Sequence, residues 1–453
     1  METIGVLLGL ALLIVLALRG VNIFLASILG ALVVAVTNGL GIATAFGQEF
    51  TGGMFGFAGR YFLLFLAGAV FGRVMGESGA AASIAHALAD RLGARRALVI
   101  TTFATAFLTY GGVNVFIVVF ATYPLGLVLV QRANIPKRLL LAAIGLGAGT
   151  FTMTALPGSP SIQNVISAQN LGTTLAAAPV LGLVAGAIML ALGLVYLEWQ
   201  QRRAERSGED FRPAASDVLP DAEDSHPTPH WALASLPLVV VAATILVPLW
   251  LASLIDFESS DSPVSAVLRF ARDQQTLWPV LAMAVATLLA VFSMRRFLPE
   301  ISKTLGRGAE SSALPLLNTA VVIGFGGVVQ ATAAFNWFTG LMLGSGFPPL
   351  VSAAISVNII AAIVGSASGG LGIWMPTLAQ YYLDAGVPPE ILHRVVTVAA
   401  GGFDTMPHCG AVITFLTITG LTHREAYKDL FMICVAIPVV ATIVIVALGM
   451  TMY

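Results

Sequence analysis

The sequence predicts an all-α polytopic membrane protein built from inverted repeats, and three observations predict it. Of its 453 residues, 57% are hydrophobic and 10% are charged, whereas a soluble globular chain carries about a quarter charged residues. Apolar runs that reach the roughly 20 residues a helix needs to cross the hydrocarbon recur along nearly the whole chain. Four further runs are interrupted by glycine, proline and small polar residues, with one pair of interruptions in each half.

The helices are expected in the following order. Uninterrupted apolar runs predict helices near 4–18, 22–40, 57–75, 174–197, 231–254, 275–294, 312–335 and 429–451. The interrupted segments are 97–131, 138–169, 349–383 and 389–420. The first and third are long enough to enter the membrane, turn and leave on the same side, so we interpret them as re-entrant helical hairpins. The second and fourth are interpreted as broken helices.

The basic residues predict an orientation, because cytoplasmic loops carry the excess of lysine and arginine. With the N-terminus outside, all basic residues are cytoplasmic except Arg60, Arg73, Arg269, Arg272 and Arg394. This assignment works only if both hairpins return to the side they entered, one from the cytoplasm and one from outside. Opposite entrance sides imply a pseudo-two-fold axis in the membrane plane.

The chain is expected to divide into two halves joined by a linker. The first half, 1–197, contains the hairpin 97–131 and the broken helix 138–169. The second half, 231–453, contains the hairpin 349–383 and the broken helix 389–420. The stretch 198–230 between them is rich in charge and proline, so it is expected to be a solvated cytoplasmic linker.

Several classes of function are disfavoured by the composition. Cys409 and Cys434 are the only cysteines, so neither a disulfide framework nor a four-ligand cysteine metal site can be built. We expect no metal and no cofactor. No basic run indicates nucleic acid. An enzyme is not expected, because the breaks contain no nucleophile with a base beside it, and Ser366 and Ser368 have no basic neighbour in their own break.

The four breaks predict a binding site at membrane depth, because backbone outside a helix is tolerated there only where protein or a wet cavity satisfies it. Pro160, Pro376 and Pro407 are each expected at the first position of a half-helix, where the missing N–H costs nothing. Gly111 and Gly112 precede a helix expected from Val113. Each helix start carries about half a positive charge, so converging starts favour an anion.

The substrate-binding residues are expected within these breaks. Hydroxyl and amide groups that can bind carboxylate and hydroxyl oxygens are Thr109, Asn114, Ser159, Ser161, Gln163, Asn164, Ser366, Ser368 and Thr405. Also expected at the site are Tyr110, Gly111, Gly112, Gly158, Gly369, Gly370 and His408. The alternative is that the breaks are ordinary kinks whose small residues allow close helix packing.

Asp404 is the candidate for coupling transport to a proton, because a carboxylate at membrane depth is costly and marks an ion or proton path. It lies four residues before His408, at the expected start of a half-helix. It could instead cap that helix. Arg60, Arg73 and Arg394 lie near apolar segments and are expected to extend toward the membrane surface, although one of them could approach the substrate.

Three motifs together resemble the gluconate:proton symporter (GntP-type) family over almost the full length. They are Tyr110-Gly-Gly-Val-Asn-Val-Phe-Ile-Val-Val-Phe120, Thr154-Ala-Leu-Pro-Gly-Ser-Pro-Ser-Ile-Gln-Asn164 and Gly402-Phe-Asp-Thr-Met-Pro-His-Cys-Gly-Ala-Val-Ile-Thr414. Gluconate permeases of the family carry an acidic residue at the first hairpin tip. Here the tip is Gly111-Gly-Val-Asn114, which is more similar to the branch that includes hydroxybutyrate permeases, and this favours a short hydroxycarboxylate.

The resemblance implies secondary active uptake of hydroxy acids or sugar acids, driven by protons, across a bacterial inner membrane. The wider group of ion transporters with paired hairpins implies a homodimer with an elevator mechanism. Sodium coupling and a passive anion channel remain open as alternatives at this stage. The expected partners are therefore a small organic anion, a proton or sodium ion, the lipid bilayer and a second copy of the chain.

Overall fold

The computed structural model describes residues 2–110, 115–159, 161–215, 217, 228–254, 262–274, 277–334 and 346–452. Every regular element in these ranges is a helix, which confirms the all-α class. By length and composition, five of the described helices can cross a membrane: Ile42–Glu77, Lys137–Ala155, Pro179–Ser207, Ile301–Gln330 and His423–Met450. Several shorter apolar helices accompany them.

The first half contains ten α-helices in its described part. They are α1 (Glu2–Leu18), α2 (Ile23–Thr37), α3 (Ile42–Thr44), α4 (Thr51–Glu77), α5 (Ala80–Leu92), α6 (Ala97–Tyr110), α7 (Val115–Arg132), α8 (Lys137–Gly149), α9 (Ile162–Leu171) and α10 (Pro179–Ser207). Helix α5 was not expected from the sequence. The tip of the first hairpin, with Gly111, Gly112 and Asn114, lies outside the described residues.

The second half is organised in a similar way. Its described helices are α11 (Trp231–Leu254), α12 (Pro263–Asp273), α13 (Leu277–Ser293), α14 (Ile301–Gln330), α16 (Pro349–Val364), α17 (Ala367–Asp384), α18 (Pro389–Ala400), α19 (Gly410–Thr419), α20 (His423–Phe431) and α21 (Ile437–Met450). Helix α12 was not expected, and α14 begins earlier than 312. π-helical turns occupy Ala45–Phe50, Phe151–Ala155 and Met432–Ala436.

Two predicted helix starts are wrong. Pro376 lies inside α17, which begins at Ala367 because the Ser366 hydroxyl caps it by accepting from the Gly369 N–H at 3.3 Å. Helix α19 begins at Gly410, three residues after Pro407, because 401–409 forms successive turns and Cys409 takes the capping position. Pro160 lies outside the described residues, and α9 is capped by Ser161.

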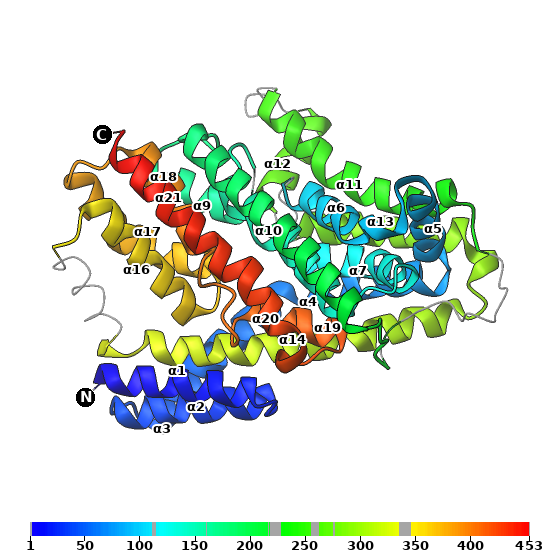
Figure 1. Cartoon of the computed structure of the whole chain (residues 1–453). Coiled ribbons are helices and arrows are strands. Elements are labelled where there is room, and N and C mark those ends of the chain that lie inside the picture. The colour runs from blue at the N-terminus through cyan, green and yellow to red at the C-terminus, as the bar shows by residue number, and fades with distance from the viewer. Residues whose placement is uncertain are drawn as a thin grey trace.

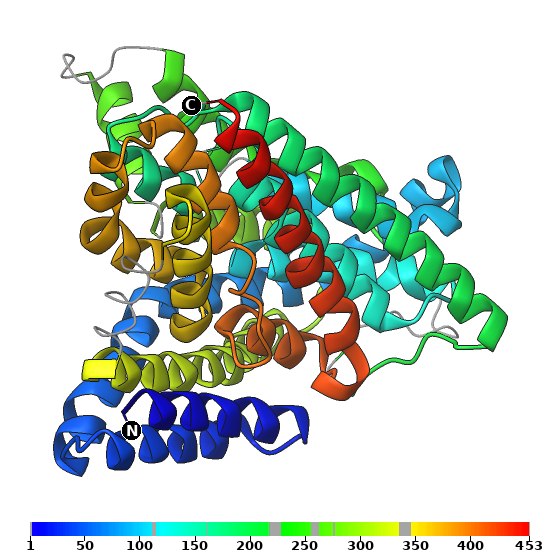
Figure 2. The ribbon, with the colours of Figure 1, turned by 60° about the vertical axis from the view of Figure 1, so that its left-hand side comes forward.

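The two halves show the same local packing pattern. Helix α6 contacts α7 and α8, and in the second half α16 contacts α17 and α18. Helices α4 and α14 run against each other, and α1 and α2 lie side by side on the α14 face (Figure 1). Helices α10 and α21 also lie side by side, as both views indicate (Figure 2).

Glycines allow α14 to approach closely the π-helical turn Ala45–Phe50, which precedes α4. A Cβ added to Gly324 would come within 2.8 Å of the Phe50 carbonyl oxygen, and one added to Gly327 within 2.5 Å of the Glu49 carbonyl oxygen. Since real Cβ atoms do not come this close, only glycine fits at these positions. The run Gly324-Phe-Gly-Gly327 is therefore a packing surface, as expected for small residues between membrane helices.

The beginning of the linker is docked onto the first half. Helix α10 continues through Ser207, and the Glu209 carboxylate pairs with Arg138 at 2.7 Å. The hydrogen bond from Arg138 holds the pKa of Glu209 below its usual range. Arg138 also pairs with Asp429 of α20 at 2.5 Å, so it joins the linker to both halves. This part of the linker is mostly exposed, as expected, and these ion pairs hold it against the helices.

Candidate binding cavity

A cavity of about 450 Å³ lies between the two halves. Its walls come from α4, α7, α8, α9, α14, α16, α17, α19 and the turn 401–409. This volume falls within the range of about 300–1,000 Å³ that small-molecule sites occupy. Because both halves contribute, the cavity depends on how they pack together.

Three helices begin at this cavity. The lining residues include Ile162 and Gln163 of α9, Ala367 and Ser368 of α17, and Gly410 and Ala411 of α19. These are the first residues of each helix, where backbone N–H groups have no partner within the helix. Their partial positive charges make the cavity favourable for an anion.

Polar side chains line one side of the cavity. The Ser366 and Ser368 hydroxyl oxygens lie 3.3 Å apart at the start of α17. The Gln163 amide also lines the cavity and has no hydrogen-bond partner within the described part of the chain. Hydroxyl and amide groups of this kind can donate to carboxylate oxygens and exchange hydrogen bonds with a substrate hydroxyl.

Asp404 lies in the cavity wall with 7% of its surface exposed. The Thr405 hydroxyl donates to its carboxylate at 2.8 Å, and the Tyr427 hydroxyl donates to the Thr405 carbonyl at 3.1 Å. No cationic side chain pairs with Asp404 among the residues that the structure describes. Burial of a carboxylate without a cationic partner costs free energy.

Aromatic rings and one arginine also line the cavity. The Phe57 and Tyr61 ring centroids are 4.6 Å apart, and Phe116 packs edge-on against both. Arg60, between Phe57 and Tyr61 on α4, also lines the cavity. The sequence predicts that Arg60 extends toward the membrane surface, and it leaves open that one of Arg60, Arg73 and Arg394 approaches the substrate. The sequence Phe57-x-x-Arg60-Tyr61 indicates that Arg60 lies beside the two aromatic rings, because its spacing places all three side chains on one helical face.

Comparison with known proteins identifies the family. Residues 1–451 match the family described as GntP family permease. The chain belongs to the GntP permease family. It is 40% identical over 453 residues to the uncharacterized transporter YxjC of Bacillus subtilis (strain 168), with 96% of each chain covered. It is 24% identical over 428 residues to a high-affinity gluconate transporter of Escherichia coli (strain K12), covering 90% of this chain and 89% of the relative.

Among solved structures, the chain is similar to the YdaH transporter of Alcanivorax borkumensis. That similarity has a TM-score of 0.44 and 16% identity, and covers 89% of this chain and 87% of the other. The family membership, together with the apolar helices, identifies the protein as a membrane permease.

The permease structure brings part of the predicted site together. Predicted residues that line the cavity are Gln163, Ser366, Ser368, Gly369, Asp404 and Thr405. Predicted residues that are described but do not line it are Thr109, Tyr110, Gly158, Ser159, Ser161, Asn164, Gly370 and His408. The binding roles of the first group remain predictions.

Three residues of the second group, Tyr110, Ser159 and Ser161, hold the break between α8 and α9 in place. The Tyr110 hydroxyl donates to the Pro157 carbonyl at 3.1 Å, and the Ser159 hydroxyl donates back to the Tyr110 carbonyl at 2.9 Å. The Ser161 hydroxyl donates to the Met153 carbonyl at 2.7 Å. These residues therefore tie the end of α6 to the broken helix, since their polar groups are used within the protein.

Asn164 and Arg394 form a buried junction between the halves. The Asn164 amide donates to the Ser159 and Leu175 carbonyls at 2.7 and 2.8 Å. Arg394 is fully buried and donates to the carbonyls of Ala155, Leu175 and Ala177 and to the Asn164 side chain. The expectation that Arg394 extends toward the membrane surface is wrong, because these carbonyls satisfy its guanidinium inside the protein.

His408 faces away from the cavity and packs against α16. Its Nε2 lies 2.8 Å from the Ala362 carbonyl, and 1% of the residue is exposed. This contact holds the turn 401–409 against the end of α16. Asp404 and His408 belong to the same turn, but only Asp404 reaches the cavity.

Proposed function

We propose that this permease is a proton-coupled symporter of a small hydroxycarboxylate, such as 3-hydroxybutyrate, or of a sugar acid such as gluconate. The observation that carries the proposal is the convergence of three described helix starts, from both halves, on one cavity that also contains Asp404. The helix starts favour the carboxylate, and Gln163, Ser366 and Ser368 supply hydrogen bonds for its hydroxyl groups. Relatives named gluconate transporters support this substrate class.

The coupling role is proposed for Asp404. A buried carboxylate without a cationic partner is stabilised when it takes up a proton, because protonation removes the uncompensated charge. A proton that binds with the anion also reduces the net charge carried across the membrane. Sodium coupling is the alternative, because the Asp404 carboxylate, the Thr405 hydroxyl and nearby carbonyls are the hard oxygen ligands that such a cation prefers.

The mechanism we propose is alternating access of the elevator type. The hairpins α6–α7 and α16–α17 and the broken helices α8–α9 and α18–α19 would carry the cavity together past the rest of the protein, within a homodimer. The similar packing of α6 and α16 in their respective halves supports an inverted repeat, and sites at the interface of such repeats are typical of secondary transporters.

Counterflow in proteoliposomes tests this function. Vesicles are loaded with gluconate, 3-hydroxybutyrate, lactate, glycerate, citrate or D-serine, and uptake is measured with and without an imposed pH gradient. Accumulation of one hydroxy acid only under the proton gradient is the expected result. Accumulation that requires sodium instead of the proton gradient would indicate that sodium is the coupling ion. Flux that equilibrates without counterflow would favour a channel and contradict the proposal.

A further inference from the structure

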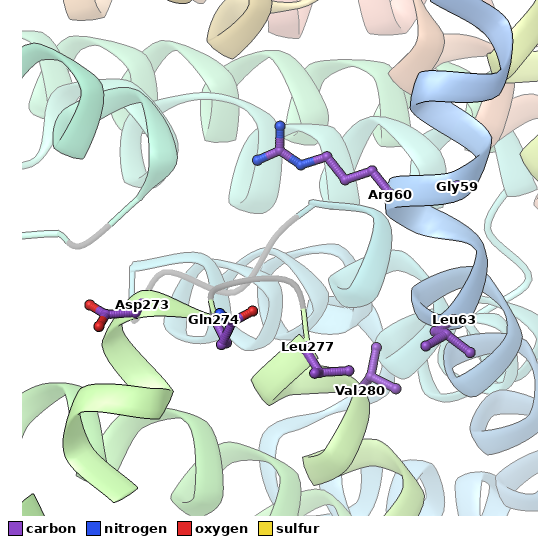
Figure 3. A pocket seen from close by; sticks show the side chains of 7 residues that line it. All are labelled: Gly59, Arg60, Leu63, Asp273, Gln274, Leu277 and Val280. Carbon is purple, nitrogen blue, oxygen red and sulfur yellow. The ribbon is translucent and has the colours of Figure 1, made fainter. Parts of the chain in front are cut away.

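Arg60 lies at the boundary between two hollows. It lines the central cavity and also a side hollow of about 410 Å³ between α4, the end of α12 and the start of α13. The side hollow is lined by Gly59 and Leu63 of α4 and by Asp273, Gln274, Leu277 and Val280 (Figure 3). Among the described lining residues, Arg60 is the one that the two hollows share.

The Arg60 guanidinium is available for a ligand. It makes no ion pair and no hydrogen bond with the part of the chain that the structure describes. Its Cζ atom lies over the Tyr61 ring, 5.6 Å from the ring centroid. By contrast, Arg73 on the same helix pairs with Glu77 at 2.6 Å. The charged side chains that line the hollows, besides Arg60, are Asp404 in the central cavity and Asp273 in the side hollow. Among the described side chains that line the two hollows, Arg60 is therefore the one with a positive charge.

Glycines leave room on both sides of Arg60. Gly59 lines the side hollow, and Gly56 lines the central cavity. A Cβ added to either glycine would meet no atom within 4 Å, so neither is required for helix packing. The backbone of α4 next to Arg60 therefore borders open space at both glycines.

We propose that Arg60 determines charge selectivity by binding the carboxylate of the incoming anion first in the side hollow and then in the central cavity. This inference rests on the proposed function. It adds a first binding site and names the residue that recognises the carboxylate there. The orientation expected from the basic residues places this end of α4 on the outer side, which is where uptake begins. A planar guanidinium can donate to a carboxylate from either face of the boundary by a change of rotamer.

Substitution of Arg60 tests the charge selectivity. Binding of 3-hydroxybutyrate and of its neutral amide is measured on purified wild type, Arg60→Lys and Arg60→Gln, at low and high salt. In Arg60→Gln, acid affinity should fall about ten- to hundredfold, the usual value of a charge-assisted hydrogen bond, while amide affinity changes little. Arg60→Lys should keep part of the preference for the acid. Arg73→Gln is the matched control and should keep all of it.

Filling each hollow separately tests the two-station path. Gly59→Leu, in the side hollow, should slow association and dissociation of the acid by the same factor and leave the Kd unchanged. Gly56→Leu, in the central cavity, should raise the Kd. Thermal unfolding shows whether both variants are folded. If Gly59→Leu does not fold, Gly59→Ala is used in its place, and if Gly56→Leu does not fold, Gly56→Ala is used.

Each result has a definite meaning. Retention of the acid preference in Arg60→Gln, or unchanged rates in Gly59→Leu, would overturn the inference while leaving the proposed function intact. Failure of the wild-type protein to bind any acid of the panel would instead overturn the proposed function.

Discussion

The side chains of Asn164 and His393 meet at 2.7 Å, although 229 residues separate them. An amide oxygen only accepts hydrogen bonds, so His393 Nε2 donates and its Nδ1 accepts from the Thr173 hydroxyl at 2.6 Å. The Arg394 guanidinium donates to the same Asn164 oxygen at 3.3 Å. Asn164 is thus a junction between the halves, while its neighbour Gln163 faces the cavity.

Adjacent substitutions should separate these two roles. Asn164→Ala should destabilise the protein by about 1–3 kcal/mol, because it leaves buried donors without an acceptor. Gln163→Ala should leave the thermal unfolding temperature nearly unchanged and weaken substrate binding. Thermal unfolding and equilibrium binding, measured on both variants, check the prediction. Equal stability of the two variants would contradict the assignment.

Asp404→Asn should abolish accumulation against a gradient and preserve exchange of preloaded substrate. The amide keeps the size of the carboxylate but cannot take up and release a proton at physiological pH. Uphill uptake and counterflow are measured in the same vesicles, with monodispersity in detergent as the control for folding. Loss of both activities to the same extent in a folded variant would argue against the coupling role.

Ser368→Ala should weaken substrate binding about two- to tenfold, because it removes a neutral hydrogen bond worth about 0.5–1.5 kcal/mol. Ser356→Ala is the matched control on the neighbouring helix. Its hydroxyl accepts from the Trp374 indole at 2.8 Å in the buried core, so its loss should lower stability without changing affinity. An unchanged Kd in Ser368→Ala would count against a hydroxyl contact with the anion.

Two glycines of α17 should respond in opposite ways to alanine. Gly372 lines the cavity, and an added Cβ meets nothing within 4 Å, so Gly372→Ala should fold and reduce the cavity. Transport of a six-carbon sugar acid should then fall relative to a four-carbon hydroxy acid. An added Cβ at Gly370 would come within 2.7 Å of the Ala361 Cα, so Gly370→Ala should cost about 1–3 kcal/mol through overpacking. Uptake ratios and unfolding temperatures distinguish the two effects.

The buried ion pair of the linker should be a strong determinant of stability. Lys137 and Asp217 meet at 2.7 Å with 3% and 1% of their side chains exposed. Asp217→Ala should destabilise the protein by about 3–5 kcal/mol, because Lys137 is left buried without a counterion. The double variant Lys137→Met, Asp217→Leu should recover much of that loss, as measured by thermal unfolding. A double variant no more stable than Asp217→Ala would indicate that the charges themselves are needed.

The membrane class, the helix order and the positions of the four breaks could be predicted from the sequence. Long apolar runs and clusters of glycine and proline are local signals, and each acts on its own segment. Helix starts were less predictable. Pro376 is tolerated inside α17 because Ser366, ten residues earlier, supplies the cap. The apolar runs of the sequence do not predict α5 and α12, because these helices are short and less apolar than the helices around them.

By itself, the sequence determined that this protein is a GntP family permease with broken helices, because composition and motifs are properties of the chain. The tertiary structure decided which residues of the breaks face the cavity. Successive residues at the start of a helix point in different directions, so the neighbours Gln163 and Asn164 have different surroundings. It also decided that Arg60 reaches the cavity and Arg394 does not, because the packing of the two halves places one beside open space and the other among carbonyl groups.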